Sequence, residues 1–340
     1  MIALTVAMAF ALPTVLLLAV DVRLHHKYEK TSAYNVWGYR GPVVPGKRAD
    51  EYRVVFLGGS AAFGYGVDWE DSIAARLERK LQGRIVGPYR RFTVVNLAFN
   101  NEGAYSFRFT LEDYSWLKYD LVCLYEGYND VMSRNTAVFR HDSPIFRLTG
   151  YLPLFPLVFR EKAAVMLTGD VNSIYPFGGG KTVFRPNLAS RTAAETLRAA
   201  ADVEAALERQ IDRVASEGPR QVADTASTGC SDWPEYCRSV LTAIDFALQH
   251  DRQALAITQP YELGKVGRAH REQQREMAAM IERRFGGEPR VAYVNLGPTV
   301  DLENPSLSYD HMHLTAAGNA IVADALVEPV VRMAARRAGQ

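Results

Sequence analysis

Short apolar runs alternate with segments of helical periodicity along most of this chain. The apolar runs are typical of buried strands, and in the segments between them apolar residues recur at helical spacing. Strand and helix in alternation predict βαβ units, so we expect an α/β fold with a central parallel sheet covered by helices on both faces. The predicted strands are 53–57, 93–97, 121–125, 254–258 and 291–296, and the predicted helices are 72–81, 104–117, 193–215, 236–249, 269–285 and 315–336.

The first twenty residues, MIALTVAMAFALPTVLLLAV, form an uncharged apolar run. As a helix rising 1.5 Å per residue, this run would just cross a hydrocarbon core of about 30 Å. Only Thr5 and Thr14 in it are polar, and it lacks the basic start and the small-residue cleavage site of a cleaved signal peptide. We therefore predict a transmembrane anchor over 1–22, or an uncleaved signal, which would attach the protein to a membrane through residues 1–20.

Two features give opposite indications of the orientation of this anchor. By the positive-inside rule, the basic residues that follow it would hold the C-terminal side in the cytoplasm. In contrast, Cys230 and Cys237 lie in a polar, loop-like stretch and could close a small disulfide, which would need an oxidising compartment. We expect the rest of the chain to lie outside the cytoplasm, in a periplasm or at the cell surface. The basic residues in question are Arg23, Lys27 and Lys30.

Composition excludes several classes of function. The chain has 340 residues, 48% of them hydrophobic, which is enough for a substantial core. Lys and Arg (39) nearly balance Asp and Glu (38), so the basic patch of a nucleic-acid-binding protein is not expected. The three cysteines and seven histidines show no zinc-type spacing, and we expect neither a metal nor another cofactor. Cys123, inside an apolar run, is expected to be a reduced core residue.

The domain organisation follows from the same pattern. Residues 23–52 are rich in Gly and Pro and predict a connector, followed by one domain over 53–336. An insertion over 131–190, rich in aromatic residues, Leu and Pro, interrupts the alternation. It could add core packing or form a lid or acyl-chain surface near a site or membrane. Its GGGKT stretch is not a phosphate loop, because Tyr175 occupies the position where that motif needs Gly.

The stretch RVVFLGGSAAFGYG, from Arg53 to Gly66, resembles a buried strand that breaks into a tight glycine turn. Such a turn could cradle a phosphate or present a serine. The dinucleotide fingerprint G-x-G-x-x-G fails in each register, because Ser60 stands two residues after Gly58 and Ala61 two after Gly59. The turn therefore favours Ser60 as a candidate nucleophile, which would need a base, a carboxylate and oxyanion donors.

Candidate partners of the serine lie far from it in the sequence. In SYDHMHL, Asp310 and His313 are three residues apart, so the carboxylate could orient the imidazole, although His311 competes for that role. Asn129, in LYEGYND, follows a predicted strand and could donate to an oxyanion or simply form a turn. Gly103, in NNEGAYS, could offer a backbone N–H at a helix entry or be an ordinary loop glycine.

The order of these motifs resembles the SGNH, or GDSL-like, hydrolase superfamily. The resemblance covers about 53–130 and 290–335, and it implies a three-layer, flavodoxin-like sandwich with about five strands. It also implies a role for each motif. The nucleophile would be Ser60, the other triad members Asp310 and His313, and the oxyanion donors the backbone N–H of Ser60, Gly103 and Asn129.

One residue departs from the family pattern. The usual Gly-Asp-Ser is here Gly58-Gly59-Ser60, and the missing acidic residue is not a member of the triad. Its loss could alter the turn or a nearby hydrogen bond. The α/β-hydrolase elbow G-x-S-x-G also matches almost fully, but that fold places several strands before its serine. Here only about thirty residues separate the predicted anchor from the first predicted strand.

From these motifs we expect a serine esterase that cleaves an ester, such as an O-acyl group on a carbohydrate or lipid, through an acyl-enzyme on Ser60. Two alternatives remain open. If a sugar hydroxyl replaced water, the same residues would make an O-acyltransferase. A membrane-tethered binding protein that has lost turnover would keep the fold without the chemistry. The sequence indicates a small-molecule, glycan or lipid ester as partner and does not indicate an oligomeric state.

Overall fold

The computed structural model describes most of the chain, and it leaves the predicted helix over 193–215 and much of the predicted insertion over 131–190 outside the described residues. The chain divides into two compact units, which are described separately below. The described residues are 2–29, 34–155 and 228–339. The smaller unit comprises 1–28 and 142–221, and the larger unit comprises 29–141 and 222–340.

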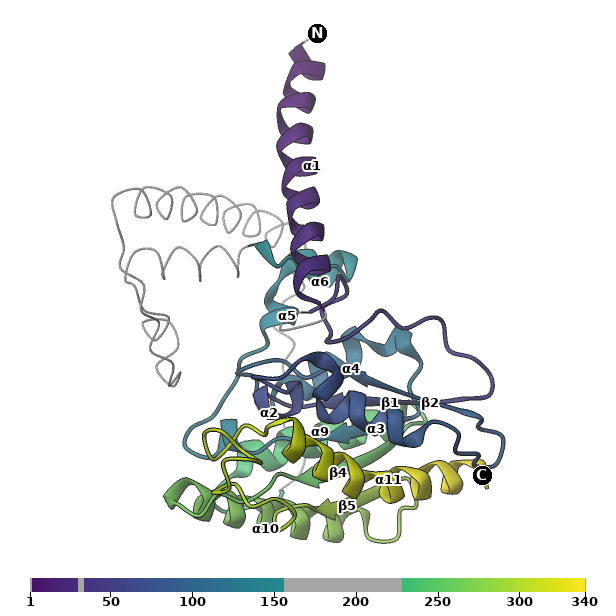
Figure 1. Ribbon diagram of the computed structural model, residues 1–340, viewed down its shortest axis with the longest axis vertical. Helices are drawn as coiled ribbons and strands as arrows, with labels where there is room; N and C mark the ends of the chain where they lie inside the picture. The colour runs from purple at the N-terminus through teal and green to yellow at the C-terminus, as the bar shows by residue number, and fades with distance from the viewer. Residues whose placement is uncertain (1, 30–33, 156–227, 340) are drawn as a thin grey trace. The chain divides into compact units, whose positions relative to one another are not determined.

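A parallel sheet of five strands is the centre of the larger unit (Figure 1). The strand order is β2-β1-β3-β4-β5, and each neighbouring pair is parallel. The inner strands are buried along their whole length, as expected when helices cover both faces. All five predicted strands are confirmed. Their bounds are β1 Glu51–Leu57, β2 Arg91–Asn96, β3 Leu121–Leu124, β4 Gln253–Thr258 and β5 Val291–Asn295.

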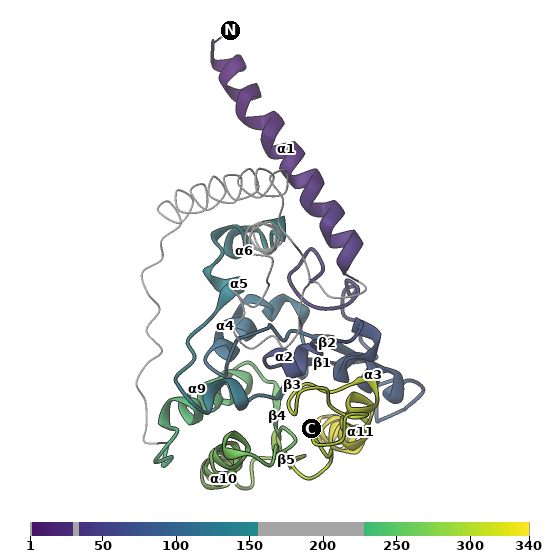
Figure 2. The same ribbon diagram turned by 60° about the vertical axis from the view of Figure 1, so that its left-hand side comes forward.

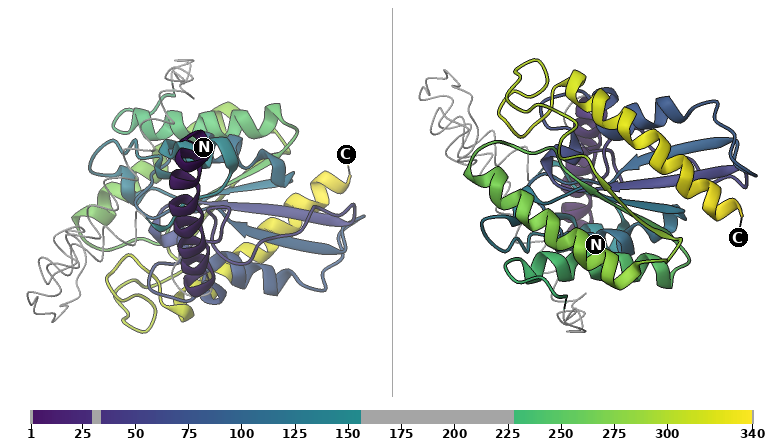
Figure 3. Two further views of the ribbon diagram at one scale, coloured as in Figure 1. Left: turned by 90° about the horizontal axis from the view of Figure 1, so that it is seen from above. Right: turned by 90° about the horizontal axis from the view of Figure 1, so that it is seen from below.

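Helices cover both faces of this sheet, which confirms the predicted α/β architecture. Helices α3 and α11 pack against each other, and α9 contacts both α4 and α10. Figures 2 and 3 show α11 and α9 on opposite sides of the sheet. The longer helices of this unit are α3 Ile73–Leu81, α4 Ser106–Asp113, α9 Pro234–Gln249, α10 Lys265–Phe285 and α11 Ala316–Ala338. The shorter ones are α2 Ser60–Phe63, η1 Trp69–Asp71, η2 Ser115–Leu117 and η3 Tyr128–Asp130, and α5 Phe139–Asp142 ends at the border of the units.

The strand order determines where a site can form. The chain leaves β1 for β2 on one side and then crosses back to β3 on the other side of β1. The crevice beyond the carboxyl ends of β1 and β3 is therefore a topological switch point, where open α/β sheets bind ligands. Ser60 follows β1 and Asn129 follows β3, so both lie at this crevice.

The smaller unit contains α1 (Ile2–Tyr28) and α6 (Pro144–Thr149). Near the end of α1, the buried Asp21 accepts hydrogen bonds from the Tyr151 hydroxyl and the Phe155 backbone amide. These contacts attach the last turns of α1 to the segment that follows α6.

The predicted transmembrane anchor over 1–22 is not confirmed. Within the residues whose placement is described, no helix combines the length and the apolarity needed to cross a membrane. Helix α1 forms where the apolar run predicted one, but it continues past that run to Tyr28. Its last turns carry the polar residues Asp21, Arg23 and His25, and Asp21 is engaged by protein donors.

Candidate active site

Ser60 lies on the turn that joins β1 to α2, and its side chain is half-buried. Glycine is required in this turn because the backbone approaches β3 closely. A Cβ atom on Gly58 would overlap with the Tyr125 carbonyl oxygen. The Ser60 Oγ lies 2.8 Å from Nε2 of His313, although the two residues are 253 positions apart in the chain. The structure thus brings together the predicted nucleophile and its predicted base.

Asp310 and His313 face each other in the loop before α11. The His313 Nδ1 and the Asp310 Oδ2 are 2.5 Å apart, and Asp310 Oδ1 accepts a 2.7 Å hydrogen bond from the His313 backbone N–H. Burial by itself would raise the pKa of Asp310, but its hydrogen bonds with His313 outweigh burial and hold that pKa below the usual range. The carboxylate therefore stays ionised and orients the imidazole toward Ser60.

The neighbouring His311 is excluded from this triad by its backbone. Its φ is +65°, a left-handed conformation that His adopts more readily than most side chains. Its ring is 58% exposed and lies 3.3 Å from Glu303. Asp310 and His313, on either side of this left-handed residue, point toward each other.

Asn129, in the 3₁₀ turn η3, lies beside the serine turn. Its Nδ2 donates a 2.8 Å hydrogen bond to the Glu102 carbonyl oxygen, and a Cβ atom on Gly59 would overlap with that same nitrogen. Asn129 Nδ2 has a second N–H to offer. Gly103 follows Glu102 directly, so the structure brings the predicted oxyanion donors to one place.

Asp130, for which the sequence predicted no role, forms a hydrogen bond with the loop that contains Gly103. Its Oδ2 accepts a 2.8 Å hydrogen bond from the Ala104 backbone N–H, and a Cβ on Gly103 would lie 2.5 Å from its Oδ1. Burial raises the pKa of Asp130 to about 7. The adjacent Glu126 is also buried and also had no predicted role. A sequence signal existed, since LYEGYND places a glutamate directly after a buried strand.

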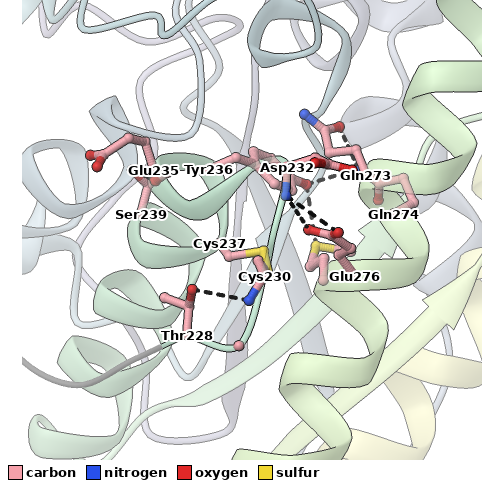
Figure 4. The surroundings of a disulfide bond; sticks show 12 residues. Thr228, Cys230, Asp232, Glu235, Tyr236, Cys237, Ser239, Gln273, Gln274 and Glu276 are labelled. Atoms are coloured by element: carbon pink, nitrogen blue, oxygen red, sulfur yellow. Dashed lines mark hydrogen bonds between the residues drawn. A yellow bond between two sulfur atoms is a disulfide. The ribbon is translucent and has the colours of Figure 1, made fainter.

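Among the described residues, one group has the composition of a metal site, namely Cys230, Cys237 and Glu276. The two cysteines form a disulfide bond (Figure 4), so they do not offer thiolate ligands. The short separation of Cys230 and Cys237 in the sequence makes this disulfide possible, and the structure contains it. Cys123 is buried and free, as predicted, and burial raises the pKa of its thiol well above the usual range.

A cavity of about 230 Å³ opens beside Asp130 in the larger unit. Three aromatic residues, Tyr105, Trp233 and Tyr236, contribute to its wall together with hydrogen-bonding groups. Arg134, another lining residue, lies 3.6 Å from Glu235 and over the Tyr105 ring. Because Asp130 adjoins Asn129 in the chain, this cavity begins one residue away from the candidate site.

Comparisons with known proteins give distant structural matches only. No family model matches the chain, and no curated protein does. One similar solved structure is a lipolytic protein of the G-D-S-L family from Desulfitobacterium hafniense, 12% identical, with a TM-score of 0.42 over 81% of this chain and 98% of the other. Another is a family two carbohydrate esterase from Clostridium thermocellum in complex with cellohexaose (13%, TM-score 0.38, 85% and 66%).

A third similar structure is a catalytic mutant of an acetylxylan esterase from Geobacillus stearothermophilus. It is 13% identical, with a TM-score of 0.43 over 85% of this chain and 96% of the other. Of these three neighbours, two are named as esterases and one as a lipolytic protein of the G-D-S-L family. These three TM-scores are below 0.5, so the similar structures do not indicate what this chain does. The geometry of the site does.

Proposed function

We propose that this protein is a serine esterase of the SGNH, or GDSL-like, type. The observation that carries the proposal is one unbroken chain of contacts, from Ser60 Oγ to His313 Nε2 at 2.8 Å and from His313 Nδ1 to Asp310 Oδ2 at 2.5 Å. A hydroxyl, an imidazole and a carboxylate in this order are the elements of nucleophilic acyl transfer.

In the first step, Ser60 Oγ attacks the ester carbonyl carbon while His313 Nε2 takes the hydroxyl proton. Asp310 keeps the other ring nitrogen protonated and stabilises the imidazolium that forms. The tetrahedral oxyanion is held by the N–H groups of Ser60 and Gly103 and by the Asn129 amide. His313 then returns its proton to the leaving alcohol, and the acyl group remains on Ser60.

In the second step, water attacks the acyl-enzyme. His313 takes a proton from the water as the new C–O bond forms, and the Ser60–acyl bond breaks as that proton passes to Ser60 Oγ. The products are a carboxylic acid and free enzyme. A sugar hydroxyl in place of water would transfer the acyl group instead, through the same residues.

For the substrate, we propose an O-acylated carbohydrate. The cavity beside Asp130 supports this choice, because aromatic faces such as Trp233 with surrounding hydrogen-bond donors and acceptors suit a sugar ring. Replacement Trp233→Ala tests it. We expect a higher KM for an acetylated xylo-oligosaccharide and an unchanged KM for 4-nitrophenyl acetate. Equal effects on both esters would contradict the carbohydrate assignment.

Labelling with a fluorophosphonate probe tests the enzyme assignment. The full-length protein should become labelled, and Ser60→Ala should abolish the label. A protein that stays unlabelled under conditions where a known serine esterase reacts would instead be a binding protein on the same fold.

Product analysis separates hydrolysis from transfer. Free acetate should appear from the acetylated oligosaccharide when no acceptor sugar is present. Product that appears only after an acceptor is added would replace the esterase assignment with an O-acyltransferase.

We also propose that the domain acts outside the cytoplasm. The Cys230–Cys237 disulfide supports this location, because such bonds persist in oxidising compartments.

A further inference from the structure

The buried carboxyl group of Glu126 receives three backbone hydrogen bonds. Its Oε2 accepts from the Gly59 N–H at 2.5 Å, and its Oε1 accepts from Gly127 N–H at 2.8 Å and from Asn129 N–H at 3.1 Å. Gly59 immediately precedes the nucleophile, and Asn129 carries an oxyanion donor. One side chain at the end of β3 therefore joins the two segments that the reaction needs at a defined separation.

The space around Gly59 shows why this carboxyl comes from another strand. A Cβ on Gly59 would lie 2.5 Å from Glu126 Oε2 and 2.8 Å from the Glu102 carbonyl oxygen. The volume that a side chain at position 59 would enter is thus filled by the Asn129 amide, whose Nδ2 would overlap with that Cβ, together with the carboxyl of Glu126. A glycine at this position and a glutamate at position 126 are two parts of one arrangement.

The surroundings of Glu126 hold its backbone as well as its side chain. The Tyr236 hydroxyl donates a 2.7 Å hydrogen bond to the Glu126 carbonyl oxygen, and Gln274 donates to that hydroxyl at 2.9 Å. Tyr236 lies in the first turn of α9, next to the disulfide-bonded Cys237 (Figure 4). The Glu126 backbone is therefore anchored from a second element, α9.

Burial of a carboxyl group costs free energy, because the group loses its hydrogen bonds to water. Glu126 is 3% exposed, and burial, with a further contribution from Asp130, raises the pKa of its carboxyl to about 8. The three amide hydrogen bonds offset only part of this penalty. Buried polar groups with several precise partners act to hold those partners in a single arrangement.

We propose that Glu126 is a positioning residue for catalysis, which holds the Gly59–Ser60 turn and Asn129 at the separation that the transition state requires. This inference rests on the proposed function. Because Glu126 is buried, its loss should affect the rate of reaction more than the binding of substrate.

The variant Glu126→Gln tests the inference. A glutamine keeps the size of the side chain but replaces one acceptor oxygen with an N–H₂ group, which faces a backbone N–H and displaces it. We expect kcat for 4-nitrophenyl acetate to fall by about 10²-fold, the loss that a small displacement of reacting groups produces. KM should change less than about threefold.

The matched control is Glu78→Gln in α3. Glu78 is also a largely buried glutamate, whose Oε2 accepts a 2.7 Å hydrogen bond from the Val94 N–H of β2, and burial also raises its pKa. It contacts the sheet away from the serine turn. Both variants are compared per active site, after titration with a fluorophosphonate, so that unfolded protein does not enter kcat.

The outcomes separate the two proposals. A wild-type protein that is not labelled contradicts the proposed function. If the wild type is labelled and active, the inference is supported when Glu126→Gln loses kcat and Glu78→Gln does not. It is overturned when Glu126→Gln keeps its kcat, or when both glutamine variants lose kcat equally.

Discussion

At the scale of single residues, the loop before α11 contains two histidines, His311 and His313, and the sequence motif assigned the role of base to His313. The structure separates them by backbone conformation, since His311 is left-handed and faces Glu303 while His313 bonds to Ser60 and Asp310. Position in the loop, and not residue type, decides which ring can act as the base.

We therefore predict opposite results for the two substitutions to asparagine. His313→Asn should lower kcat by about 10⁴-fold or more, because the serine loses its base. His311→Asn should leave kcat within about twofold, since Asn tolerates the left-handed conformation. Steady-state ester hydrolysis measures both, and a large loss in His311→Asn would mean that the triad is assigned to the wrong ring.

A second prediction concerns the coupling of positions 59 and 126. In the wild-type background, Gly59→Asp should lower activity by about 10²-fold, because the new side chain meets Glu126 and Asn129. After Glu126→Ala has removed the carboxyl, the same change should cost less, although the Asn129 amide and the Glu102 carbonyl oxygen still border that space. A double-mutant cycle on kcat/KM measures the difference, and additive effects would show that the two positions do not share that space.

A third prediction concerns stability against pH. Burial raises the pKa of Glu126 to about 8 and that of Asp130 to about 7. The folded chain thus holds protons that the unfolded chain has already released. The resulting stability is complete below the unfolded pKa values of about 4 and is lost as the pH rises through 7 to 8.

Thermal unfolding between pH 5 and 8.5 checks this expectation. The Tm of the wild type should fall over this range, and that of Glu126→Gln should fall less, because the variant lacks one of the two titrating groups. Parallel curves for the two proteins would contradict the assignment of the proton to Glu126.

At the scale of elements, α5 is tied to the sheet by one buried arginine. Arg140 donates hydrogen bonds to the carbonyl oxygens of Gly38, at 3.1 Å, and Leu97, at 2.7 Å, and it lies 3.8 Å from the buried Glu102 carboxylate. The Arg140 guanidinium therefore links the segment before β1, the end of β2 and Glu102, which directly precedes Gly103.

We predict that Arg140→Met lowers the free energy of unfolding by about 3 kcal/mol, since it leaves Glu102 as an unpaired buried charge. Urea denaturation of the full chain measures the change. As a control, Arg332→Met on the exposed side of α11 should cost less than about 0.5 kcal/mol. Similar losses in both variants would show that Arg140 is not a structural tie.

The boundaries of elements show what the sequence could and could not reveal. Strands were predicted to within two residues because their apolar runs are continuous. The predicted helix over 104–117 instead divides into α4 and η2 around Tyr114, whose ring is buried in the body of the domain. Helix α10 begins at Lys265, earlier than predicted, because its first turn is polar and shows no periodicity.

At the scale of the whole molecule, topology turns separate motifs into one site. Ser60, Asn129 and His313 were predictable because each stands in a recognisable motif at the end of a strand or before a helix. The place of Glu126 directly after a buried strand was visible in the sequence, but its role was not, because that role depends on β3 lying beside β1. The transmembrane anchor was predicted from the length and apolarity of the first twenty residues, and no helix of the described residues meets the requirement for crossing.

A final prediction applies to the intact chain purified without reductant. One of the three cysteines is free and two are bonded. After denaturation, a maleimide reagent should modify one thiol per chain before reduction and three after it. Three reactive thiols before reduction, in protein isolated from its native compartment, would contradict the proposed extracytoplasmic location.

Glu126 accepts a hydrogen bond from Gly59, which lies 67 positions earlier in the chain. This separation affects how similar arrangements can be found in other sequences. A pattern that requires an acidic residue directly before the serine misses this arrangement, although a carboxyl oxygen lies 2.5 Å from where a Cβ at position 59 would stand. The arrangement can be written as a sequence pattern with two parts, Gly-Gly-Ser after the first strand and Glu-Gly-x-Asn-Asp after the third. Chains that match both parts would be expected to share the buried carboxyl beside the serine turn, and chains with only one part would not.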